Sequence, residues 1–129
     1  MKTLLILAIS SLVYLPAFTS SAADSAPKDL RLFYQQHCAG CHGSDGAALS
    51  SEGKRLKGED FTAAGFRKDT DDAGMVKVIL KGKFFGLAMP AFKNDLSKEE
   101  ALRMVTEILR KSERGKVIQP DAIPVPQAK

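Results

Sequence analysis

The chain of 129 residues contains no tryptophan, only two cysteines and only two histidines. Two cysteines cannot build the multi-bridge framework that holds small disulfide-rich domains together. All four of these residues fall between His37 and His42, so any metal or redox chemistry that needs them is confined to one short segment. Charged residues make up 26% and hydrophobic residues 44% of the chain, which excludes a disordered or fibrous protein and indicates one globular domain.

The excess of basic residues is small and dispersed. The formal net charge is +4, but acidic residues such as Asp69, Asp71 and Asp72 interrupt the basic ones. A nucleic-acid-binding protein usually concentrates its positive charge on one face. The sequence therefore predicts a mixed, solvated surface and no nucleic-acid partner.

The longest apolar stretch lies near the N-terminus and is short for a membrane span. It covers residues 4–15, whereas a transmembrane helix needs about 20 apolar residues. Lys2 precedes it and small residues follow it, which is the pattern of a signal peptide. We predict that residues 1–23 are a signal peptide cleaved near Ala22 or Ala23, and that the protein is periplasmic without membrane insertion. An uncleaved N-terminal anchor is the alternative.

The remaining chain is expected to form one all-α domain over residues 24–115, followed by a proline-containing tail over residues 116–129. Apolar residues at helical spacing predict helices over residues 29–38 and 72–81 and a third beginning after Ser97. No segment shows the alternation of a β-strand.

The ends of these helices carry capping residues. Asp29 is placed to cap the first helix, and Gly82 to end the second. Ser97 with Glu100 three residues later is a capping box, and Gly115 is expected to end the last helix. Residues 43–65 show no sustained periodicity, and a loop of this length in a small domain is usually organised around something.

The segment Cys38-Ala39-Gly40-Cys41-His42 has the spacing C-x-x-C-H, which is the signature of covalent c-type haem attachment. Two thiols that add to the two vinyl groups of one porphyrin must lie about one helical turn apart. The next residue then directs its imidazole to the iron. We predict that Cys38 and Cys41 attach one haem c and that His42 is an axial ligand.

Three other chemistries use similar residues. A thioredoxin-like dithiol needs a preceding strand and a βαβ pattern, and neither is visible. A zinc site needs four ligands around a tetrahedron, but the four available residues are nearly contiguous. A structural disulfide between Cys38 and Cys41 would close a very small, strained loop. These remain the alternatives to haem.

The run YQQHCAGCHGSDG, the later MPAF and the capped C-terminal helix resemble a small class I cytochrome c, from about Leu30 to Arg114. The resemblance implies the cytochrome c fold, with three to four helices and long loops around one covalently attached haem. It also implies a methionine as second axial ligand, at the position of Met89. An electron carrier of this kind is not an enzyme, and its partners are redox proteins.

Other candidates for the sixth iron ligand can be compared with Met89. Met89 lies in an apolar loop that no periodicity explains, and Pro90 stiffens it. Met104 belongs to the apolar stripe of the last helix, and Met75 lies on the apolar face of the second, where it remains an alternative ligand. His37 is held on the attachment side of the ring and cannot reach across.

Further features of the family transfer less directly. Many members have a proline after the motif whose carbonyl binds the second nitrogen of the axial histidine, but this chain has no proline between Pro27 and Pro90. The partner of His42 is therefore not predicted.

The remaining candidates for contact with the haem are basic and aromatic side chains. Lys54, Arg55 and Lys57 are either haem propionate partners or ordinary surface charges. The predicted haem wall and remaining core consist of Phe61, Phe66, Phe84, Phe85 and Phe92.

Four lysines flank the methionine loop, where the haem edge is expected to be most exposed: Lys77, Lys81, Lys83 and Lys93. They predict a basic docking face with an apolar centre for acidic redox proteins.

Two alternative functions are also compatible with a haem protein. In one, the sixth ligand is labile and the protein is a small-ligand sensor or weak peroxidase. In the other, the protein is a dedicated electron-transfer subunit of one dehydrogenase or reductase.

Overall fold

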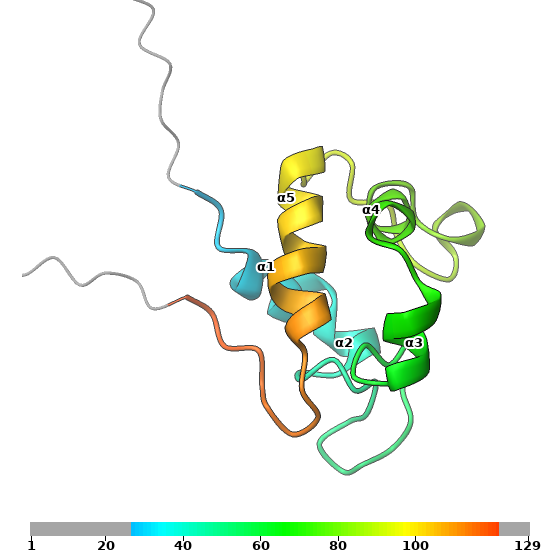
Figure 1. Ribbon diagram of the computed structural model, residues 1–129, viewed down its shortest axis with the longest axis vertical. Coiled ribbons are helices and arrows are strands. Elements are labelled where there is room, and N and C mark those ends of the chain that lie inside the picture. Colours follow the sequence, from blue (N-terminus) through cyan, green and yellow to red (C-terminus); the bar gives the residue numbers. More distant parts are fainter. Residues whose placement is uncertain (1–26, 122–129) are drawn as a thin grey trace, which may run out of the picture.

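The computed structural model describes residues 27–121, so the predicted signal peptide and the end of the predicted tail lie outside the described residues. Over this range the chain is helical, and its β structure is limited to isolated bridges. α1 crosses the C-terminal helical segment, and α4 packs beside α5 (Figure 1). The predicted all-α fold class is confirmed. The helical elements are α1 (Leu30–His37), α2 (Ala39–His42), α3 (Ala64–Asp69), α4 (Asp72–Lys81), η1 (Phe84–Gly86), α5 (Lys98–Arg103), η2 (Met104–Ile108) and η3 (Leu109–Lys111).

The first helical segment ends in the C-x-x-C-H motif. The Asp29 side chain caps α1, as predicted, by accepting hydrogen bonds from the backbone N–H groups of Arg31 and Leu32 at 3.0 and 2.9 Å. Cys38 ends α1 and directly precedes α2, which closes at Gly43 with a positive φ of 80°. The short helix α2 therefore carries Cys41 and His42 at a fixed distance from α1.

The second predicted helix agrees with α4 at both ends. The Asp71 side chain accepts a hydrogen bond from the Gly74 N–H at 2.7 Å, and Gly82 ends the helix with a φ of 73°. The sequence did not predict α3, because this helix has no side-chain cap and buries no residue.

The last helix begins with the predicted capping box of Ser97 and Glu100, in which both hydrogen bonds are present. It continues through a π-helical segment, η2, and ends at Lys111 rather than at Gly115. The prediction of its end was wrong because Ser112 leaves the helix, and its carbonyl accepts a hydrogen bond from Arg67. The Gly115 N–H then binds the carboxylate of Asp45 at 2.6 Å.

The start of the predicted tail packs against the domain. Ile118 is buried, and its N–H donates to the Ser44 carbonyl at 2.9 Å. The Gln35 side chain from α1 donates to the Ile118 carbonyl at 2.6 Å. These contacts fasten the segment after the last helix to α1 and to the loop that follows the motif.

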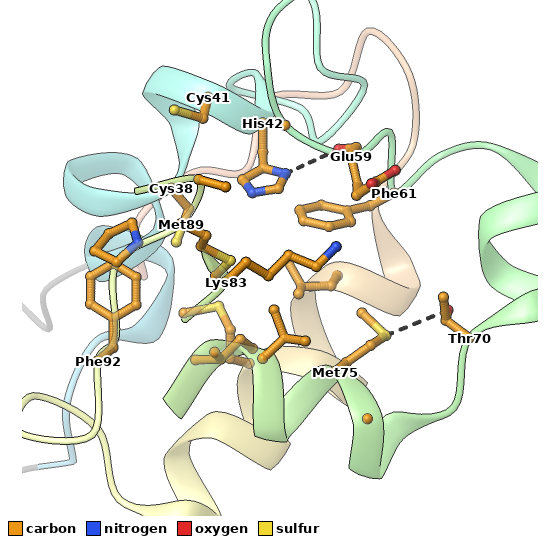
Figure 2. Close-up of a pocket in the computed structure, with 18 of the residues that line it drawn as sticks. Cys38, Cys41, His42, Glu59, Phe61, Thr70, Met75, Lys83, Met89 and Phe92 are labelled. Carbon is orange, nitrogen blue, oxygen red and sulfur yellow. Dashed lines mark hydrogen bonds between the residues drawn. The ribbon is translucent and has the colours of Figure 1, made fainter. Parts of the chain in front are cut away.

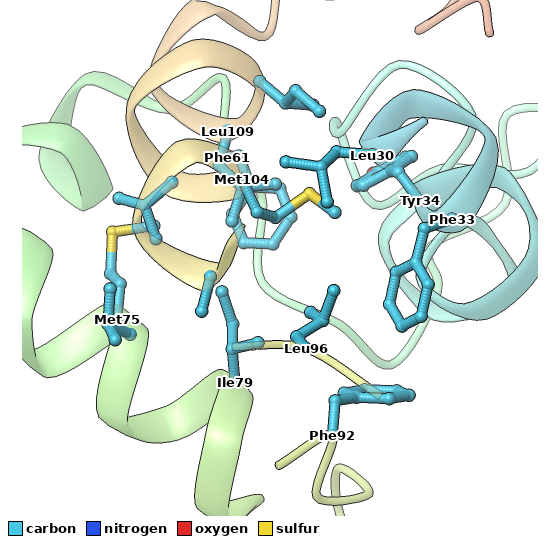
Figure 3. Close-up of a cluster of buried hydrophobic side chains, with 14 of the residues drawn as sticks. Leu30, Phe33, Tyr34, Phe61, Met75, Ile79, Phe92, Leu96, Met104 and Leu109 are labelled. Carbon is cyan, nitrogen blue, oxygen red and sulfur yellow. The ribbon is translucent and has the colours of Figure 1, made fainter. Parts of the chain in front are cut away.

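One apolar core joins the first, fourth and last helical segments (Figure 3). Tyr34 from α1 is fully buried beside Met104 and Val105 of η2, and α4 contributes Met75 and Ile79. The Tyr34 hydroxyl donates to the Gly43 carbonyl at 2.8 Å, which ties the core to the end of α2. Burial raises the pKa of the Tyr34 hydroxyl far above its ordinary value, so this donor stays protonated.

Candidate haem site

The side chains of the predicted site gather around one cavity of about 510 Å³ (Figure 2). This volume lies in the range of about 300–1,000 Å³ that is usual for cofactor and ligand sites. Cys38, Cys41 and His42 line the cavity from the first helical segment, and Met89 lines it from the segment between η1 and α5. The four residues singled out from the sequence are thus brought to one place.

The His42 imidazole is held in a fixed tautomer and orientation. Its Nδ1 lies 3.0 Å from the Glu59 carbonyl oxygen, and a carbonyl has no proton to donate, so Nδ1 carries the proton. Nε2 is therefore unprotonated and available to coordinate a metal ion. The ring stacks on Phe61 with centroids 4.4 Å apart and an interplanar angle of 17°. Both contacts restrict rotation of the imidazole.

Electrostatics favour the neutral form of His42. Burial lowers the pKa of its imidazole, and the hydrogen bond to the Glu59 carbonyl opposes this effect. The nearby positive charges of Lys83 and Arg55 lower the pKa further. A neutral imidazole is the form that binds iron.

The contact to Glu59 depends on a close approach of the backbone at Gly58. The Gly58 N–H donates to the Cys41 carbonyl at 2.8 Å. A Cβ atom at Gly58 would lie 2.5 Å from that carbonyl oxygen and 2.6 Å from Nδ1 of His42. The sequence did not predict a role for Gly58 or Glu59, because a backbone acceptor leaves no side-chain signature. Gly58 is one of five glycines in residues 43–65, so its presence did not single it out.

No disulfide joins Cys38 and Cys41. Burial raises the pKa of the Cys38 thiol to about 12. Dithiol oxidoreductases instead depend on a cysteine whose pKa is lowered, so that it reacts as a thiolate. Within residues 27–121, no cluster of three or more histidine, cysteine or acidic side chains is arranged to hold a metal ion. The thioredoxin and zinc alternatives therefore receive no support from this geometry.

Met89 is held by a short hairpin that starts at the end of α4. The Lys83 N–H donates to the Met89 carbonyl at 3.0 Å. Gly82 approaches the same carbonyl so closely that a Cβ atom there would lie 2.5 Å from its oxygen. The Met89 side chain is half-buried and packs against the apolar core. The backbone thus fixes the position from which Met89 reaches the cavity.

The other ligand candidates have different surroundings. Met104 is fully buried in the core, as expected. Met75 is buried on the cavity wall, where its sulfur lies 3.7 Å from the Thr70 hydroxyl. His37 is exposed, and its ring packs against Phe33 with centroids 4.4 Å apart.

The prediction of an aromatic wall holds for three phenylalanines, holds in part for Phe84 and is wrong for Phe85. Phe61 and Phe92 are buried, and Phe66 packs against the core. Phe84 reaches only the rim of the cavity and is 75% exposed, and Phe85 is fully exposed. Both adopt left-handed backbone conformations, with φ of 48° and 56°, and both side chains are largely exposed.

The candidate propionate partners also differ from one another. The Arg55 guanidinium binds backbone carbonyls of its own loop, while Lys57 lines the cavity. Lys54 is exposed and is not part of the cavity wall. Lys83, which was predicted only as a docking residue, lines the cavity as well.

The residues present fit a covalently attached haem. The wall is largely apolar and aromatic, one neutral imidazole offers Nε2, and two thiols lie about one helical turn apart. A thioether sulfur, that of Met89, completes the kind of donor set that electron-carrying haems use.

Comparisons with known proteins identify the family of this chain. Residues 25–106 match the family described as cytochrome c oxidase, cbb3-type, subunit III. Cytochrome c6 from Leptolyngbya boryana is 38% identical over 82 residues, which cover 64% of this chain and 88% of the relative. The solved structure of the KustC0563 c-type cytochrome is 31% identical, with a TM-score of 0.53 over 64% of this chain and 95% of that one. The structure of a point mutant of Kustc0563 is 28% identical, with a TM-score of 0.53 over 67% of this chain and 100% of that one.

The chain belongs to this family and is a small class I c-type cytochrome. Its cofactor is covalently bound haem c, and it is an electron-transfer protein.

Proposed function

We propose that this protein is a periplasmic monohaem cytochrome c that carries single electrons between redox proteins and is not an enzyme. Cys38 and Cys41 hold the haem through thioether bonds, and His42 and Met89 are the axial ligands. The observation that carries this proposal is the bond from His42 Nδ1 to the Glu59 carbonyl, which leaves Nε2 to face a cavity that Met89 also lines.

The haem supplies the one-electron exchange between ferric and ferrous iron. The chain holds the ring, orients the imidazole and excludes water with its apolar wall. A thioether ligand favours the ferrous state and raises the reduction potential above that of a bis-histidine haem. With both axial positions filled, the protein offers no open position to a substrate.

The first test is the absorption spectrum of the oxidised protein, exported in a host that attaches haem. We expect the weak long-wavelength charge-transfer band of methionine sulfur bound to ferric iron. In Met89→Ala the band is expected to disappear and the iron to become high-spin, because no other thioether replaces the lost ligand. Absorption and magnetic circular dichroism measure both effects.

Met75→Leu is the matched control, because it removes the thioether of a second methionine on the cavity wall, where Met104 is the third. It is expected to keep the band. A band that survives in Met89→Ala and vanishes in Met75→Leu would assign the ligand to Met75. A high-spin wild type would favour a sensor or weak peroxidase with an open sixth position.

We further propose that redox partners dock on a basic face formed by Lys77, Lys81, Lys83 and Lys93. From Ala73 to Asn94 the sequence has no acidic residue. The centre of this face is an apolar tip formed by Phe84, Phe85 and Leu87, all of them exposed. Because Phe84 reaches the rim of the cavity, the tip lies beside the haem site. The charge favours an acidic partner protein and brief encounters.

Small redox ions of opposite charge test this face without a natural partner. In the triple variant Lys81→Gln, Lys83→Gln, Lys93→Gln, we expect oxidation of the ferrous protein by ferricyanide to slow about tenfold at low salt. Oxidation by a cationic cobalt(III) complex is expected to accelerate, because the repulsion is removed. Stopped-flow rates at several ionic strengths measure both effects.

The control is a second triple variant, Lys54→Gln, Lys98→Gln, Lys111→Gln. It changes the net charge equally at other exposed positions. Its rates are expected to stay near those of the wild type. Equal effects of the two triple variants would show that net charge alone acts and would reject the docking face.

Export to the periplasm is supported by the N-terminal pattern of the sequence. In the part of the chain that the structure describes, no helix is both long enough and apolar enough to cross a bilayer.

A further inference from the structure

Arg55 lies in the loop between α2 and α3, and its guanidinium joins two backbone carbonyls of that loop. It donates to the Gly58 oxygen at 3.2 Å and is 3.5 Å from the Ala48 oxygen. The backbone of Arg55 is itself placed by an antiparallel bridge to Leu49. The side chain therefore connects the segment after the haem motif to the segment that contacts the imidazole.

Both carbonyls lead back to His42 by separate routes. The Ala48 N–H donates to the His42 carbonyl at 2.7 Å. On the other side, the Gly58 N–H donates to the Cys41 carbonyl at 2.8 Å, and the adjacent Glu59 carbonyl holds Nδ1 of His42 at 3.0 Å. The guanidinium thus completes a ring of hydrogen bonds that runs from the backbone of His42 to the imidazole of the same residue.

Arginine suits this position for a geometric reason. Its planar fork presents several N–H donors in fixed directions, so one side chain satisfies two carbonyls at once. A lysine carries the same charge but concentrates its donors on one flexible ammonium group. It would not hold the two segments at a constant separation.

We propose that Arg55 is a positioning residue for the axial histidine: it fixes the Gly58–Glu59 segment and thereby the hydrogen bond at Nδ1 of His42. The inference rests on the proposed ligation of iron by His42. A stronger bond at Nδ1 makes the imidazole a better electron donor to the metal. Loosening the segment therefore makes the iron easier to reduce.

The test uses the full-length, haem-loaded protein and the variant Arg55→Lys, which keeps the positive charge but loses the fork. We expect exchange of the His42 Nδ1 proton with solvent, followed by NMR of the ferrous protein, to become about tenfold faster. The reduction equilibrium with a mediator is expected to shift several-fold toward the ferrous form. Because attachment is covalent, the measurement is made on the loaded fraction even if Arg55→Lys yields less of it.

Lys54→Met is the neighbouring control, because Lys54 is exposed and outside the cavity. It is expected to leave the proton exchange unchanged. Exchange in Arg55→Lys within about twofold of the wild type, with the methionine–iron band intact, overturns the inference. Failure of the proposed function differs from this result, because the wild type itself would then lack bound haem or show high-spin iron.

Discussion

Replacing Gly58 with alanine is expected to lower the free energy of unfolding by about 2–3 kcal/mol and to weaken the hydrogen bond that orients His42. The new methyl group would lie 2.5 Å from the Cys41 carbonyl oxygen and 2.6 Å from Nδ1 of His42. Contacts this short cannot persist, so either the Gly58 segment or the imidazole must move. Either movement lengthens the bond between Nδ1 and the Glu59 carbonyl, which is 3.0 Å in the native protein.

Two measurements separate these effects. Denaturant titration gives the change in stability, and exchange of the His42 Nδ1 proton reports the hydrogen bond. Gly40→Ala is the matched control, because Gly40 lies two residues before His42 and has no atom within 4 Å of the position of its Cβ. That variant is expected to be neutral or slightly stabilising, since alanine favours the helix. Equal behaviour of the two variants would contradict the steric argument.

Gly82→Ala is expected to act on Met89, the proposed second axial ligand. Gly82 has a φ of 73°, and its Cβ would lie 2.5 Å from the Met89 carbonyl oxygen. The left-handed conformation costs a non-glycine residue about 1–2 kcal/mol, and the overlap adds about 1–3 kcal/mol. The hairpin from Lys83 to Met89 must open to relieve the overlap. We therefore expect a smaller methionine–iron charge-transfer band and a sixth ligand that exogenous imidazole or cyanide displaces more readily.

Gly86→Ala isolates the conformational part of this effect. Gly86 has a φ of 86° in the same hairpin, but no atom lies within 4 Å of the position of its Cβ. It is expected to lose about 1–2 kcal/mol of stability and to keep the full band. If Gly86→Ala displaced the ligand as readily as Gly82→Ala, strain rather than the contact with Met89 would be responsible.

Prediction from the sequence succeeded where side chains encode their own structural role. Asp71 and Gly82 delimit α4, and Ser97 with Glu100 begins the last helix, because capping residues act on the backbone next to them. The C-x-x-C-H motif likewise predicts haem attachment from residues that are adjacent in the sequence. Its assignment to Cys38, Cys41 and His42, like that of Met89, remains a prediction that the optical spectra test.

Prediction failed where the backbone determines the outcome. The partner of His42 is a carbonyl oxygen, which every residue possesses, so nothing in the identity of Glu59 indicates the contact. Phe85 is apolar and was expected in the core, but consecutive left-handed residues turn it outward. The helix α3 has no side-chain cap and no fully buried residue, so its sequence carries little local indication of a helix.

The backbone contact to His42 has a consequence for protein engineering. Since the acceptor is the main-chain oxygen of Glu59, the side chain at this position is not required to hold the ligand. Yet Glu59 lines the cavity, where a change of charge acts on the iron through space. Position 59 is therefore a place where substitutions can adjust the electrostatic environment of the haem while leaving the backbone contact to His42, the proposed axial ligand, intact.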